Sequence, residues 1–145
     1  MCPTVSHALL LSAVLGYVWA MPVSWTVEPG GRFVVLLPTD PSTIEEWRTA
    51  MIAVLDAPIS RPRLRMLVDR RQSEPVTVGF VSQMTAFFAT HQAALSGSRR
   101  AILVSNDAAF GMARMTELKS ELENPDSTVR VFRDYSEAAL WLTSG

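Results

Sequence analysis

Short apolar runs alternate with longer amphipathic stretches along most of this chain. The runs end at turn residues after four to seven positions, as β-strands do, whereas the longer stretches repeat apolar residues every three or four positions, as helices do. We predict strands at 24–28, 32–37, 63–69, 101–104 and 128–132, and helices at 42–55, 77–95, 107–123 and 134–142. This ββαβαβαβα order is typical of a single α/β domain with a mixed, mostly parallel sheet flanked by helices.

Polar residues mark the predicted helix boundaries. Ser42 and Glu45 form a capping-box pattern, Asp107 stands where an N-cap would begin the third helix, and Gly97 would end the second. In the third helix, the periodicity predicts a buried stripe made of Gly111, Met115, Leu118 and Leu122.

A continuous apolar segment, Ala8–Ala20, precedes the first predicted strand. Its length fits the apolar core of a signal peptide, but no Lys or Arg precedes it, and it is too short to cross a bilayer comfortably. We therefore divide the chain into an N-terminal extension, residues 1–20, and one domain, residues 21–145. We interpret the extension first as a mis-assigned start, second as a signal-like segment and third as a helical membrane anchor. We therefore expect a cytoplasmic protein, with export as the alternative.

Composition and charge exclude several classes of function. The 145 residues carry a net charge of −1, which gives no electrostatic reason to expect nucleic acid or an anionic membrane as a partner. Cys2 is the only cysteine, and His7 and His91 are the only histidines, so we expect no disulfide and no metal site. No glycine-rich phosphate loop or dinucleotide fingerprint is present, and we expect no cofactor.

Several local features, in their order along the chain, resemble those of one known fold family. They are the helix start Thr43–Trp47, the strand that ends in Asp69, the passage of Ala101–Ser105 into a helix, and the closing stretch 129–142. Over about Val23 to Leu142, the chain resembles the SpoIIAA-like small bacterial domains, whose STAS fold is found in anti-sigma-factor antagonists and is related to that of the lipid-binding SEC14 domains. The resemblance implies a STAS-like domain with a non-enzymatic regulatory or protein-interaction role.

The resemblance also directs attention to the loop after the third strand. In STAS antagonists, a serine or threonine at the amino end of the second helix is phosphorylated. The equivalent stretch here runs from Asp69 to Thr77 and lacks an Asp-Ser pair, so Ser73 and Thr77 are the candidate phosphosites. Arg70 and Arg71 could pair with such a phosphate, although Thr77 is equally well explained as an ordinary N-cap.

Candidate binding residues follow the central strands. Ser105, Asn106 and Asp107 lie beyond the carboxyl end of a parallel strand, where α/β folds usually place ligand sites. At the end of the preceding strand, Asp69 could form an ion pair with Arg70 that orders the loop. Arg114 lies beside the buried stripe of its helix and could reach Asp69 or a bound anion.

Three functions remain open from the sequence. The leading hypothesis is a protein-interaction module that acts through the loops after the third and fourth strands. The alternative is a carrier or sensor of a small apolar or anionic ligand, bound between helices 77–95 and 107–123 in a pocket lined by Phe87, Phe88, Met112 and Met115. An enzyme is third, since it would need a titratable pair near Asp107. Self-association through the opening hairpin is also open if its outer strand is an uncovered edge, giving a homodimer.

Overall fold

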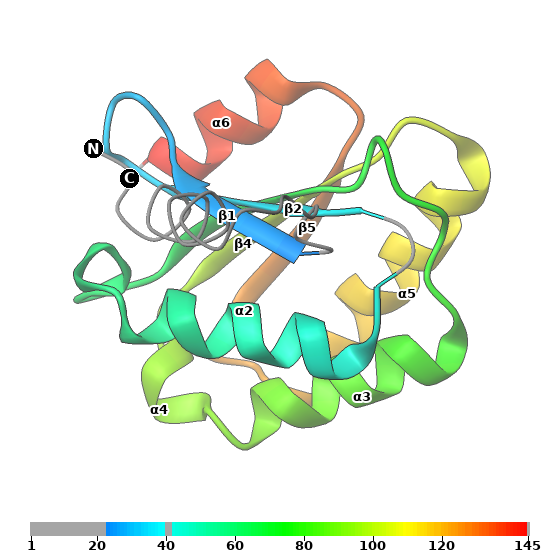
Figure 1. Cartoon of the computed structure of the whole chain (residues 1–145), viewed down its shortest axis with the longest axis horizontal. Coiled ribbons are helices and arrows are strands. Elements are labelled where there is room, and N and C mark those ends of the chain that lie inside the picture. The colour runs from blue at the N-terminus through cyan, green and yellow to red at the C-terminus, as the bar shows by residue number, and fades with distance from the viewer. Residues whose placement is uncertain (1–22, 40–41, 145) are drawn as a thin grey trace, which may run out of the picture.

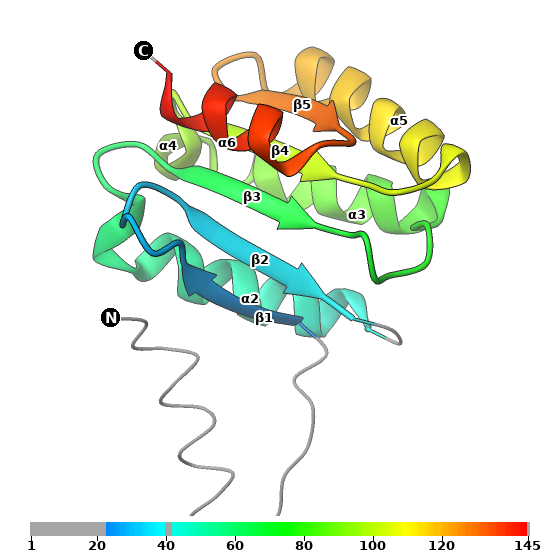
Figure 2. The same cartoon turned by 90° about the horizontal axis from the view of Figure 1, so that it is seen from above.

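A five-stranded sheet forms the centre of the protein, as seen in a computed structural model that describes residues 23–39 and 42–144. The strand order is β1-β2-β3-β4-β5, so spatial order follows chain order (Figure 2). β1 runs antiparallel to β2, and the other neighbours are parallel. The strands are β1 (Val23–Val27), β2 (Val34–Pro38), β3 (Arg65–Asp69), β4 (Arg99–Leu103) and β5 (Thr128–Phe132). The predicted mixed, mostly parallel α/β architecture is confirmed.

Helices cover both faces of the sheet (Figure 1). The crossover helices α2 (Ile44–Asp56), α3 (Val78–Ala89) and α5 (Asp107–Glu123) lie together on one face, and α6 (Tyr135–Thr143) lies on the other. Because each parallel strand is added beside the previous one, successive crossovers of the same hand place their helices on the same side. The short η1 (Pro58–Ser60) follows α2, and α4 (Gln92–Leu95) follows α3.

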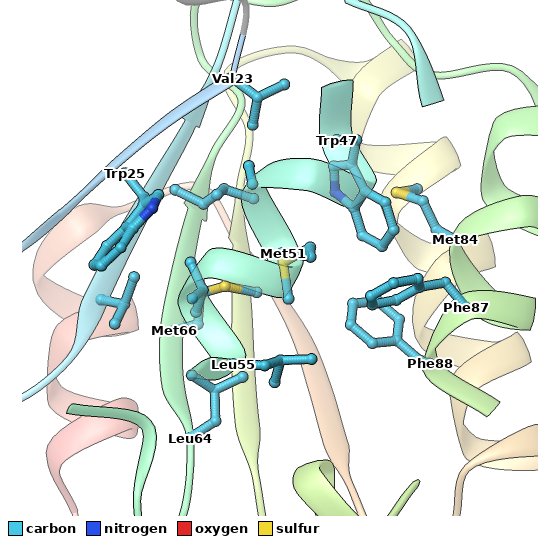
Figure 3. Close-up of a cluster of buried hydrophobic side chains, with 14 of the residues drawn as sticks. Val23, Trp25, Trp47, Met51, Leu55, Leu64, Met66, Met84, Phe87 and Phe88 are labelled. Atoms are coloured by element: carbon cyan, nitrogen blue, oxygen red, sulfur yellow. The ribbon is translucent and has the colours of Figure 1, made fainter. Parts of the chain in front are cut away.

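The larger hydrophobic core fills the space between the sheet and helices α2 and α3 (Figure 3). Trp47 of α2 meets Phe87 and Phe88 of α3 edge-to-face, with ring centroids 5.2 and 5.3 Å apart. Met51 of α2 and Met66 of β3 are fully buried beside them. On the opposite face, α6 packs on a smaller cluster formed by Phe33, Leu67, Ala101, Leu103, Phe132, Ala138 and Leu142.

Two predicted helix boundaries are wrong. The capping box of α2 is formed by Thr43 and Glu46, one residue later than predicted. The predicted helix 77–95 is two helices, because α3 ends at Ala89 and α4 begins at Gln92. Between them, the Thr90 hydroxyl donates to the Phe87 carbonyl at 2.8 Å, which satisfies one of the carbonyls left open by the end of α3.

The buried face of α5 also differs from the prediction. Leu118 and Leu122 are 51% and 84% exposed, and Gly111 is exposed as well. The buried residues of this helix are Ala109, Ala113, Glu117 and Ser120. The sheet beneath α5 offers polar groups that need partners: the Val131 N–H donates to Glu117 Oε2 at 3.0 Å, and Arg100 Nη2 donates to Ser120 Oγ at 3.2 Å. The helix therefore turns its small and polar residues, not its leucines, toward the sheet.

The remaining expectations concern the N-terminal extension, membrane spans, metal sites and the edge of the sheet. The predicted extension, residues 1–20, lies outside the described residues. Among the residues that are described, no helix has the length and apolar character needed to span a membrane, and no three His, Cys, Asp or Glu side chains are grouped to hold a metal ion. β1 lies at one end of the strand order, where a sheet edge is available, and self-association through it stays a prediction.

Candidate functional site

The loops after β3 and β4 meet at the carboxyl edge of the sheet. Asp69 ends β3, and its carboxylate binds the guanidinium of Arg71 through contacts of 3.0 Å (Oδ1–Nε) and 2.8 Å (Oδ2–Nη2). The Ser105 hydroxyl, after β4, donates to the Arg71 carbonyl at 3.3 Å. These contacts join two predicted binding segments into one surface.

The ion pair of Asp69 is therefore with Arg71, and the predicted pairing with Arg70 is wrong. Partial burial raises the pKa of Asp69, but the hydrogen bonds from the Arg71 side chain and backbone outweigh burial and hold this pKa below its ordinary value. The guanidinium of Arg70 lies 5.9 Å from the centroid of the Phe80 ring instead. An arginine two residues after the carboxylate can fold back to bind it, whereas the side chain of Arg70 is directed toward α3.

The start of α5 places Asn106 and Asp107 in roles different from those predicted. Asn106 is the N-cap, because its Oδ1 accepts a hydrogen bond from the Ala109 N–H at 2.8 Å. Asp107 is the first helical residue, and its exposed carboxylate binds Arg133 Nη2 at 2.7 Å. Sequence reasoning missed Arg133, although its place directly after β5 puts it at the same edge of the sheet.

Arg114 reaches neither Asp69 nor the carboxyl edge. It pairs with Glu117, one turn further along α5, and Glu117 in turn accepts from the backbone of β5. The predicted contact between Arg114 and Asp69 is therefore wrong, and the arginine serves the docking of α5 on the sheet.

The two candidate phosphosites are held differently. The Thr77 hydroxyl accepts from the Phe80 N–H at 3.1 Å and caps α3. Ser73 is buried, and its hydroxyl donates to the Arg70 carbonyl at 3.3 Å. Both hydroxyls thus have structural partners, and phosphorylation of either one stays a prediction.

A pocket opens between α3 and α5, over the sheet. Its cavity volume, counted as the space open to the centre of a water-sized sphere, is about 50 Å³. The loop after β3 forms the mouth, α3 and α5 form the walls, three strands form the floor, and Trp47 of α2 also lines the pocket. The lining includes Arg70, Glu74, Pro75 and Val76 at the mouth, Met84, Phe88, Met112, Ala113 and Thr116 on the helices, and Met66, Val68, Arg100, Ile102 and Val129 on the strands.

The pocket lies between the two helices for which the sequence offered a ligand site. Of the four residues named for its lining, Phe88 and Met112 line it, and Phe87 and Met115 do not. Phe87 instead stacks on His91, with ring centroids 4.1 Å apart, and meets Trp47 in the core. The break between α3 and α4, which the sequence did not indicate, places His91 where it makes this contact.

Arg100 is the most unusual residue of the pocket, because only 4% of it is exposed and it forms no ion pair with any described residue. Its Nη2 donates to the hydroxyls of Ser120 at 3.2 Å and Ser127 at 3.1 Å, and its guanidinium lies 3.7 Å from the Phe88 ring centroid. The buried Nε has no acceptor among the described residues. Burial lowers the pKa of Arg100 to about 9.

Comparison with known proteins bears on the fold. No protein-family model matches the chain, and no curated protein matches it in sequence. Among solved structures, the chain is similar to an uncharacterised protein of the DUF3478 family from Shewanella loihica, which is described as having a SpoIIAA-like fold. The TM-score is 0.56 at 15% identity, over 83% of this chain and 91% of that chain. This chain has a SpoIIAA-like fold. The resemblance noted in the sequence is thereby confirmed for the fold.

Proposed function

We propose that this SpoIIAA-like domain is a non-enzymatic carrier or sensor that holds a small molecule in the pocket between α3 and α5. The observation that carries the proposal is the lining of this pocket, in which apolar side chains from six helices and strands surround one buried cation. A concave, mostly apolar site with a few polar groups is the usual form of a small-molecule site. Asp107, near which an enzyme would need a titratable pair, is exposed and bound to Arg133.

The size of the cavity narrows the range of ligands. One buried water needs about 10–15 Å³ in the same measure of volume. The 50 Å³ of this pocket therefore suit a compact group and not the acyl chain of a lipid, as a SEC14-like carrier would hold. Met84 of α3 and Met112 of α5 both line the pocket, and their flexible thioethers can adjust to the outline of a ligand.

A regulatory role through protein interaction is the second candidate, favoured by the position of the loop after β3. This loop forms the mouth of the pocket through Glu74 and Val76, and Arg71 joins it to Ser105 at the carboxyl edge. A ligand that moves the mouth would thereby move the surface formed by the loops after β3 and β4, to which a partner protein could bind.

Methionine methyl NMR tests the binding function within the full chain. The chain has seven methionines; Met66, Met84 and Met112 line the pocket, and Met51 and Met115 do not. Titration with benzyl alcohol is expected to shift the three lining methyl resonances saturably and to leave the other two in place.

A matched pair of variants on α5 provides the control. Thr116→Phe adds a large ring to the lining of the pocket and is expected to abolish the saturable shifts, whereas Glu121→Phe places the same ring at an exposed position of the helix and should preserve them. Equal shifts at Met51 and Met115, or no saturation, would remove the support for a binding function.

A further inference from the structure

We propose, within the binding function proposed above and resting on it, that the ligand is a compact monocarboxylate with an apolar body, and that Arg100 supplies its counter-charge. The proposal comes from a mismatch between the burial of this arginine and the partners that the protein gives it. Arginine is almost never fully buried without an anionic partner, because its charge is costly to remove from water.

The protein leaves part of the guanidinium without acceptors. Among the described residues, only Nη2 has hydrogen-bond acceptors, and both are neutral serine hydroxyls. The buried carboxylate on the same side of the sheet, that of Glu117, is already used by Arg114 and by the Val131 N–H. A carboxylate ligand would supply the acceptors and the negative charge that this site lacks.

The contact with Phe88 fixes how an anion could approach. The guanidinium lies over the face of the Phe88 ring at 3.7 Å. Guanidinium N–H groups lie in the plane of the group, so stacking occupies a face and leaves the edges for hydrogen bonds. A planar carboxylate matches such an edge with two parallel hydrogen bonds.

The strand register indicates in which direction a bound ligand would extend from Arg100. Met66, Arg100 and Val129 form one row across the sheet. Val68 and Ile102 form the next row on the same face, toward the carboxyl edge and the mouth. A bound carboxylate at Arg100 would thus place its remaining atoms against this apolar row and between the helices.

The charges of the pocket lining favour a ligand with a single negative charge. Arg70 and Glu74 at the mouth have opposite formal charges, which leaves Arg100 as the net charge of the lining. A dianion such as phosphate would bring one charge more than the lining balances into an apolar site, at a high cost in desolvation.

The test compares benzoate with benzamide, two probes of nearly the same shape that differ in charge. The full chain is titrated at pH 8, at which inorganic phosphate is mostly the dianion, while the methyl resonances of Met66, Met84 and Met112 are followed. We expect benzoate to bind at least about 10-fold more tightly than benzamide, since a hydrogen bond to a charged group contributes about 1.5–3 kcal/mol. Inorganic phosphate is expected not to displace benzoate.

Three variants separate the possible outcomes. Arg100→Met should lower benzoate affinity at least about 10-fold and leave benzamide unchanged. Arg100→Lys should retain part of the preference for benzoate, and Arg48→Met, at an exposed position of α2, should retain all of it. If Arg100→Met fails to fold, the comparison of benzoate with benzamide in the wild-type protein still tests the proposal.

The results that overturn this inference differ from those that overturn the binding function. Equal affinity for benzoate and benzamide at the pocket methionines would overturn the anionic class and leave the binding function standing. Displacement of benzoate by phosphate would overturn the monocarboxylate class. Absence of any saturable shift with every probe would overturn both proposals.

Discussion

Replacing Arg100 with methionine should make the ligand-free protein more stable. The side chain is 4% exposed, and burial lowers its pKa well below the ordinary value of arginine, to about 9. A shift of this size corresponds to about 5 kcal/mol of penalty for holding the charge in the folded state. Against this, the variant loses the hydrogen bonds to the hydroxyls of Ser120 and Ser127 and the contact with the Phe88 ring, which together contribute about 3–4 kcal/mol. Arg100→Met, which keeps most of the side-chain volume, is therefore expected to stabilise the protein by about 1 kcal/mol.

The gain should depend on pH in a defined direction. Above pH 9, and below the ordinary pKa of arginine, the unfolded chain keeps the proton of Arg100 and the folded protein loses it, so wild-type stability rises with pH relative to the variant. The advantage of Arg100→Met is thus full at pH 7 and 8 and decreases above pH 9.

Urea unfolding followed by tryptophan fluorescence measures the stability difference between the two proteins and its dependence on pH. Other groups that titrate above pH 9 are common to the two proteins and cancel in this difference. A variant that is less stable than the wild type by about 2 kcal/mol or more would refute the reasoning, because such a loss is expected only where a compensated charge has been removed. A difference that does not change up to pH 10.5 would refute the assigned burial effect.

Three further changes test other parts of the structure. Asn106→Ala removes the N-cap of α5 and should lower the free energy of unfolding by about 1 kcal/mol. Asp107→Ala removes an exposed ion pair and should lower it by less than about 0.5 kcal/mol. If urea unfolding gave the larger loss for Asp107→Ala, Asp107 and not Asn106 would be the cap. Hydrogen bonds from Arg32 lower the pKa of Glu28 from 4.5 to about 2, so the stability advantage of the wild type over Glu28→Gln should be present above pH 4.5 and lost as pH falls toward 2; an advantage that persists unchanged at pH 2 would contradict this. Leu122→Ser should change stability by less than about 0.5 kcal/mol, because this leucine is 84% exposed, and a larger loss in thermal unfolding would show that it is covered in solution.

The sequence was sufficient to predict the order and type of the main elements, because those signals are local. Apolar runs and turn residues located all five strands, and β5 and α5 have the predicted bounds. The caps shifted by one residue at Thr43 and Asn106 because Ser, Thr, Asn and Asp are near-equivalent caps, and neighbouring candidates compete.

The buried face of α5 could not be predicted in the same way. Its orientation depends on groups of the sheet that are distant in sequence: Arg100 lies 20 residues from Ser120, and Val131 lies 14 residues from Glu117. Hydrophobic periodicity favoured the stripe with Leu118, because the periodicity of one helix carries no information about the polar groups of the sheet that this helix must pair with. The burial of Arg100 could not be predicted for the same reason. In the sequence this arginine directly precedes an apolar run, a position that is typical of a solvent-exposed strand end.

Distances between benzoate and the pocket side chains would test the proposed site most directly. In the full chain with labelled methionine methyls, intermolecular nuclear Overhauser effects are expected from the ring protons of benzoate to Met84 and Met112. None is expected to Met51 or Met115, which do not line the pocket. Effects on Met51 or Met115 alone, or saturable binding of benzoate without any effect on Met84 and Met112, would contradict a ligand site between α3 and α5.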